Sequence, residues 1–130
     1  RRAFSIGIVP AKPDKDAFLS PHFQQLLNGM MNVLEDTKYA ASVFAHHSAV
    51  NETEFIDSLT DGRVDALLFS GDLALEPIRE AVTKRGLPSI ALGADVRGDG
   101  PVFNADNYCG VQQALLHLKS MGHRRIAYLG

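Results

Sequence analysis

Short apolar runs alternate with amphipathic stretches along the whole of this 130-residue chain. The first run, Phe4 to Val9, is nearly continuous, as expected for a strand that helices cover on both faces of a sheet. Later apolar runs predict strands at Ala41 to Ala45, Ala66 to Ser70, Pro88 to Leu92, Val102 to Asn104 and Ile126 to Leu129.

The stretches between these runs have the spacing of amphipathic helices. We predict a first helix from Pro21, with Ser20 as its N-cap, to about Thr37. Its inward stripe is predicted to be Phe23, Leu26, Leu27, Met30 and Leu34. A second helix begins after Asn51, which stands three residues before Glu54 in the spacing of a capping box.

A third helix is predicted over about Leu75 to Arg85, and Gly86 ends it. A fourth begins near Asn107 and ends at Gly122. Its predicted inward face consists of Val111, Ala114, Leu115 and Leu118.

This alternation predicts an α/β fold, a doubly wound parallel sheet with helices on both faces. Residues 1–130 fit a single domain. The last predicted strand, Ile126 to Leu129, directly follows a helix, and such a strand stands in the middle of an α/β repeat. We therefore expect the chain to be one lobe of a larger protein.

Composition excludes several functions. The net charge of −2 comes from 13 basic and 15 acidic residues without a basic stripe, so the lobe itself is not expected to bind nucleic acid. The single cysteine, Cys109, excludes an internal disulfide and a multi-cysteine zinc site, and it fits a reducing cytoplasm. No apolar run reaches the roughly 18 residues of a membrane span, so we expect no membrane partner.

In a doubly wound sheet, ligands bind beyond the carboxyl ends of the strands. His22 and Phe23 follow the long first loop and could stack on and hydrogen-bond a sugar-like ring, or could equally be a solvated residue and a core residue. Ser70 and Asp72 end the third strand and could bind ligand hydroxyl groups, or form a plain polar turn. Cys109 is interpreted as an inert or ligand-lining thiol.

Motifs for catalysis are missing. Neither a dinucleotide-binding nor a phosphate-binding glycine loop is present, and no cofactor or metal is expected. His46 and His47 are adjacent at the end of a predicted strand, where they point in opposite directions, so one metal ion could not readily take both. An α/β enzyme that uses Asp72 and Asp95 as acid and base stays an alternative without a recognisable nucleophile.

Five segments carry a family resemblance: IGIVP, SPHFQQLLNGM, GRVDALLFSG, GLPSIAL and above all DNYCGVQQALLHLKSMGHRRIAYLG. Together they resemble the effector-binding domain of the LacI/GalR transcriptional regulators, over the first of its two lobes. The resemblance implies a lobe of the periplasmic-binding-protein type I fold in a cytoplasmic dimer. It also implies a small effector in the cleft between two lobes, and DNA binding through a head domain that is absent from this chain.

By position, His22 and Phe23 match the paired aromatic residues of the family that contact the effector, and Ser70 matches its polar residue after the third strand. Cys109 falls where some members place a ligand-contacting acidic residue. The first loop is longer than in the family, and Leu92-Gly93-Ala94 replaces a common Leu-Asp-Arg, so no sugar preference is carried over.

The resemblance also implies pairing of two copies through the first helix and second strand. Met31 and Leu116 lie off the inward stripes of their helices and are predicted dimer contacts. A periplasmic sugar-binding protein shares the implied fold and stays an alternative, although the GHRRIAYLG ending favours the regulator.

Overall fold

The computed structural model describes residues 2–10, 20–45, 51–70, 73–93 and 100–129. Its centre is a five-stranded parallel sheet with the strand order β2-β1-β3-β4-β5. The strands are β1 (Ser5–Val9), β2 (Ala40–Val43), β3 (Ala66–Ser70), β4 (Ser89–Leu92) and β5 (Val102–Phe103). The predicted doubly wound parallel sheet is therefore confirmed.

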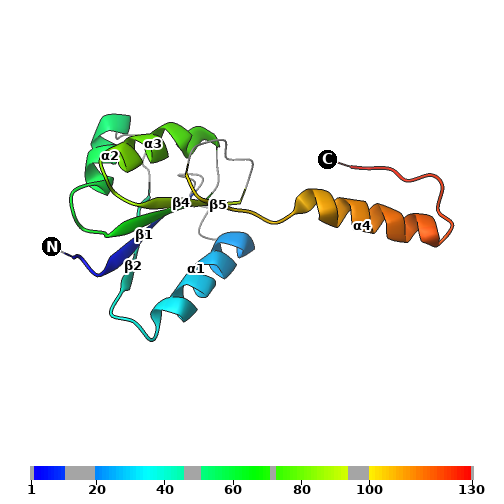
Figure 1. The fold of residues 1–130 in the computed structure, drawn as a ribbon, viewed down its shortest axis with the longest axis horizontal. Helices are drawn as coiled ribbons and strands as arrows, with labels where there is room; N and C mark the ends of the chain where they lie inside the picture. Colours follow the sequence, from blue (N-terminus) through cyan, green and yellow to red (C-terminus); the bar gives the residue numbers. More distant parts are fainter. Residues whose placement is uncertain (1, 11–19, 46–50, 71–72, 94–99, 130) are drawn as a thin grey trace.

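Helices cover both faces of this sheet (Figure 1). α1 (Pro21–Leu34) lies on one face, and α2 (Glu52–Leu59) and α3 (Glu76–Lys84) lie on the other. A short 3-10 turn, η2 (Leu73–Leu75), leads into α3. The fourth helix, α4 (Asn107–Ser120), projects from the carboxyl end of the sheet and covers neither face.

Local sequence explains where the helices begin and end. The side chain of Asn51 accepts a hydrogen bond of 2.9 Å from the backbone N–H of Glu54, as predicted. Ser20 precedes α1 without such a bond, and Pro21 takes the first helical position. α1 ends at Leu34 rather than near Thr37, because the Thr37 hydroxyl and backbone N–H both donate to the carbonyl of Leu34.

The main core lies between the sheet and the α2–α3 face. Leu67 and Phe69 of β3 are almost fully buried there, with Leu59 of α2 and Val82 of α3. Gly7 of β1 faces the same layer, where a Cβ would lie 2.5 Å from the Leu67 Cδ2. Any side chain at this strand position would have to displace its neighbours.

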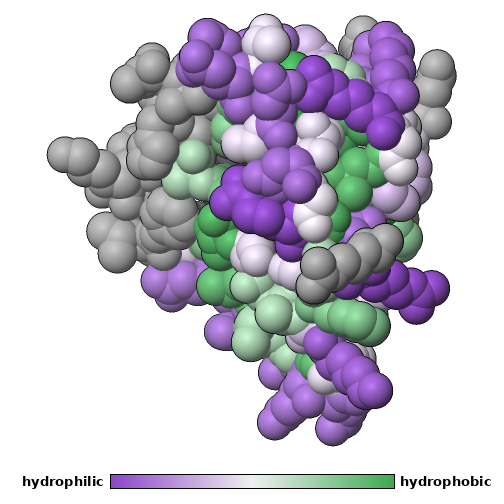
Figure 2. Space-filling model, turned by 90° about the vertical axis from the view of Figure 1, so that its left-hand side faces the viewer, coloured by the Kyte–Doolittle hydropathy of each residue, from purple (hydrophilic) through white to green (hydrophobic). Residues whose placement is uncertain are grey.

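Packing under α1 is thinner. Phe23 is its only buried residue, and the other four predicted stripe residues are half-buried: Leu26, Leu27, Met30 and Leu34. The stripe therefore faces the sheet as predicted, but α1 seals the sheet less completely than α2 and α3 do. Figure 2 shows the side where the chain begins, with hydrophilic residues at the top, in the centre and at the foot, and hydrophobic residues between them.

α3 contains a buried cation that the helical pattern did not predict. Arg79 is only 3% exposed, and its guanidinium donates to both carboxylate oxygens of Glu76. The pair lies against Gly100, where any added Cβ would clash with the guanidinium. Mutual pairing satisfies the two charges, which explains how they are accommodated within the fold.

The C-terminal part contradicts two predictions. Val111 and Leu115 were expected to face inward, yet they are 56% and 45% exposed, and no residue of α4 is buried. Ile126 to Leu129 was expected to be a strand but forms none. A strand needs a neighbour for its backbone groups and an amphipathic helix needs a surface to cover, and the described residues supply neither here.

Candidate functional site

The connections of the sheet diverge at one place. β1 continues through α1 on one face, whereas β3 continues through η2 and α3 on the other. β1 and β3 are adjacent, with Val9 opposite Phe69 in their register. Loops that leave neighbouring strands toward opposite faces open a crevice at their carboxyl ends, where α/β sheets bind ligands. The edge formed by the ends of β1, β3 and β4 is therefore the candidate site.

Ser70 lies on this edge. It is the last residue of β3, pairs in register with Leu92 of β4 and is 7% exposed. The structure thus brings Ser70 next to the position where β4 ends. A hydroxyl held on a rigid strand end is suited to hydrogen-bonding a polar ligand group.

His22 and Phe23 lie in the first turn of α1, which is directed toward the carboxyl end of the sheet (Figure 1). His22 is exposed, whereas Phe23 is 5% exposed. The imidazole is accessible to a ligand, while the phenyl ring serves the core in this structure. Phe23 was interpreted as either a ligand contact or a core residue, and its burial fits the second interpretation.

The other predicted polar contacts are placed less directly. Asp72 and Asp95 lie outside the described residues, as do His46 and His47. Cys109 is half-buried in the first turn of α4, where its N–H donates to the capping carboxylate of Asp106 and its Sγ accepts from Gln113. Because α4 projects beyond the end of β5, Cys109 is not on the strand-end edge that carries Ser70.

The two predicted dimer contacts are both exposed, Met31 at 48% and Leu116 at 57%. Met31 belongs to α1, the helix that lies on one face of the sheet, and Leu116 belongs to the projecting α4. They therefore do not form one continuous patch on this chain.

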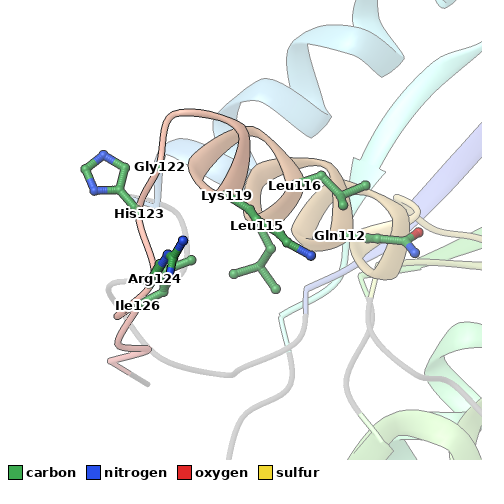
Figure 3. A pocket seen from close by; sticks show the side chains of 8 residues that line it. All are labelled: Gln112, Leu115, Leu116, Lys119, Gly122, His123, Arg124 and Ile126. Atoms are coloured by element: carbon green, nitrogen blue, oxygen red, sulfur yellow. The ribbon is translucent and has the colours of Figure 1, made fainter.

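A hollow of about 680 Å³ lies between α4 and the segment that follows it (Figure 3). Leu115, Arg124 and Ile126 point toward one another across it, and His123 points away. Its lining includes none of the predicted ligand contacts. Sequence reasoning missed this hollow because it assigned Leu115 to a helix face packed on the sheet.

Among the described residues, no group of three His, Cys, Asp or Glu side chains is placed to hold a metal ion. In the same part of the chain, no helix is both long and apolar enough to cross a membrane.

Comparison with known proteins adds independent information. No family model matches the sequence. The chain is 28% identical over 127 residues to the HTH-type transcriptional regulator MalR of Streptococcus pneumoniae. The aligned region covers 96% of this chain and 38% of MalR. The curated relatives that match along nearly the whole chain are regulators, and the chain spans about two fifths of their length.

Solved structures agree in fold. The transcriptional regulator CelR in complex with cellobiose superimposes with a TM-score of 0.76 at 23% identity, over 98% of this chain and 40% of CelR. A regulatory protein of the LacI family from Chloroflexus aggregans matches with a TM-score of 0.73 at 23% identity, over 96% of this chain and 45% of that one. The chain is therefore a homologue of the LacI-family transcriptional regulators and has the fold of a lobe of their effector-binding domain.

Proposed function

We propose that this chain is the effector-sensing lobe of a LacI-like transcriptional regulator in the cytoplasm. It binds a small polar metabolite, a sugar or a related compound, at the carboxyl edge of its sheet and does not catalyse a reaction. The observation that carries this proposal is the match to MalR along 96% of the chain. The connections that diverge after the adjacent strands β1 and β3 support the place of the site. CelR, which shares the fold, is solved with cellobiose, and this supports the ligand class.

His22 and Ser70 are the proposed direct contacts within the described part of the chain. Phe23 would hold the first turn of α1 in place beneath His22, since its ring is buried. Asp72 and Cys109 stay predicted contacts, with Cys109 reaching the ligand from the side where α4 leads away from the lobe.

The boundary of the lobe is part of the proposal. The sequence predicts one lobe over residues 1–130, but no residue of α4 is buried, which supports a shorter folded unit that ends with β5. α4 would then lead into a second wall of the cleft. Effector would close the two walls on each other and change operator affinity, because it binds the closed state more tightly than the open state.

The native parent polypeptide tests the proposed function most directly. Its intact mass and sequence would reveal an upstream helix-turn-helix head if it is a regulator. A cleaved export signal in that place would instead favour a periplasmic solute receptor and overturn the proposal.

The role of Ser70 is tested by replacing its hydroxyl. In the intact parent, we expect Ser70→Ala to weaken binding of the best ligand in a panel of mono- and disaccharides about tenfold, the effect of one lost hydrogen bond in a buried site. Isothermal titration calorimetry measures it. Ser58→Ala is the matched control, because the Ser58 hydroxyl bonds only within α2, to the carbonyl of Phe55. Equal affinities for Ser70→Ala and Ser58→Ala would remove Ser70 from the site.

We also propose that two copies pair through α1 and β2. On the two elements of this proposed surface, Met31, Val33 and Val43 are exposed apolar residues, Val33 and Val43 at 73% and 44%. Such a surface is typical of a protein interface when it is continuous.

Sedimentation velocity across micromolar concentrations tests the pairing. We expect Met31→Glu to raise the dissociation constant of the dimer at least about tenfold, because a charge buried in an apolar interface loses its hydration. Asn32→Glu adds the same charge at the neighbouring exposed position and is expected to have less effect. If Leu116→Glu alone dissociates the dimer, the interface lies on α4 instead.

A further inference from the structure

An aspartate takes the place of a strand neighbour at the beginning of β1. The two carboxylate oxygens of Asp65 accept hydrogen bonds of 2.8 Å from the consecutive backbone N–H groups of Ala3 and Phe4. The backbone N–H of Asp65 donates to the carbonyl of Ser5, also at 2.8 Å. Bonds to a charged acceptor are stronger than those between neutral groups, so this fork fixes two successive peptide units.

Phe4 has an unusual backbone within this fork. Its φ is +53°, in the left-handed region, and it is the only non-glycine residue with a positive φ in the described part of the chain. For a side chain with a Cβ this conformation is unfavourable, and it persists only where the surroundings impose it. A glycine would adopt it freely, so the phenyl ring must contribute something that a glycine could not.

The ring contacts Tyr39, just before β2. The two ring centroids are 5.6 Å apart in an edge-to-face arrangement, and the N–H of Ala40 donates to the carbonyl of Phe4 at 2.8 Å. Phe4 is thus held on one side by the residue that precedes β3 and on the other by the residues that begin β2. We call Asp65, Phe4 and Tyr39 the N-terminal clamp.

The clamp bends the chain just before β1, at the end of the sheet opposite to α4 (Figure 1). β3 connects the two ends of the sheet, because it begins directly after Asp65 of the clamp and ends at Ser70 of the candidate site. We propose that the N-terminal clamp fixes the direction in which the polypeptide that precedes residue 3 leaves the lobe. On the proposed function, on which this inference rests, that polypeptide carries the DNA-binding head, and the clamp is a positioning device for it.

Double electron–electron resonance on this chain tests the clamp itself. Spin labels are attached at Arg2→Cys and Lys84→Cys, with Cys109→Ser in the background, and the width of the distance distribution reports how well the direction of the N-terminus is fixed. We expect a narrow distribution that becomes at least about twofold wider in Asp65→Ala, which loses both hydrogen bonds. Phe4→Gly, which removes the ring contact and leaves Asp65 in place, is expected to widen it too.

Asp61→Ala is the matched control. The Asp61 carboxylate also holds a backbone N–H and a side chain, both of Arg63, but it does not touch Ala3 or Phe4. We expect an unchanged distribution in this variant, and thermal unfolding of each variant confirms that the lobe is folded. Unchanged widths in both folded Asp65→Ala and Phe4→Gly would overturn the clamp.

A second measurement separates the clamp from the proposed function. In the intact parent, we expect Asp65→Asn to weaken binding to a DNA fragment from the promoter of its own gene at least about tenfold, since heads without a fixed direction bind with a larger loss of entropy. Full DNA binding by Asp65→Asn and Asp65→Ala would overturn the positioning role. A wild-type parent that binds no DNA would overturn the proposed function, while the resonance result would still decide whether the clamp exists.

Discussion

Replacing Leu59 by alanine is expected to destabilise the lobe by about 2–5 kcal/mol, the usual cost of removing a fully buried leucine side chain. Leu59 is 0% exposed and packs in the core between the sheet and α2–α3. That loss is a large part of the roughly 5–15 kcal/mol that holds a typical domain together. Urea denaturation followed by circular dichroism measures it as a lower transition midpoint.

Leu116→Ala is the matched control, because it removes the same atoms from a leucine that is 57% exposed on α4. We expect its free energy of unfolding to stay within about 0.5 kcal/mol of the wild type. If both substitutions cost the same, α4 packs on the lobe in solution, and the shorter folded unit proposed above is wrong.

Gly7→Ala is expected to destabilise the lobe by about 1–3 kcal/mol, although it adds only one methyl group. The new Cβ would lie 2.5 Å from the Leu67 Cδ2 and 2.7 Å from the Phe44 Cε2. Leu67 is 1% exposed in the central sheet, so its side chain would have to shift within the packed core. The same denaturation experiment measures the effect.

Gly29→Ala makes the identical change within α1, where nothing lies within 4 Å of the added Cβ. We expect it to stabilise the lobe by about 0.5–1 kcal/mol, because alanine favours a helix interior over glycine. Opposite signs for the two substitutions support the packing described for β1. A stabilising Gly7→Ala would contradict it.

Much of the fold could be predicted because its signals are local. The apolar run at β1, the Asn51 cap and the alternation of strands with helices each depend on neighbouring residues, and the structure confirms them. The parallel, doubly wound arrangement then follows from the preferred handedness of βαβ connections. The candidate site was predictable for the same reason, since Ser70 ends a strand whose direction the sheet determines.

The rest depends on partners that a local pattern does not reveal. The stripe Val111 to Leu118 is amphipathic, yet among the described residues it has no surface to cover, so periodicity alone predicted packing that this part of the structure lacks. The burial of Arg79 follows from its tertiary surroundings and its pairing with Glu76, which helical periodicity does not reveal. The strained Phe4 could not be predicted, because Asp65, which holds it, lies far away in the sequence.

The position of β1 in the sheet has a consequence for the order of folding. β1 precedes both of its neighbours in the sequence, yet it lies between β2 and β3, and Ile8 and Val9 become fully buried only after both neighbours are in place. β3 begins at Ala66, so synthesis must continue past that residue before β1 is covered on both edges. The lobe therefore cannot complete its core from its N-terminus onward, and pairings distant in sequence make its folding slow compared with that of a helical bundle.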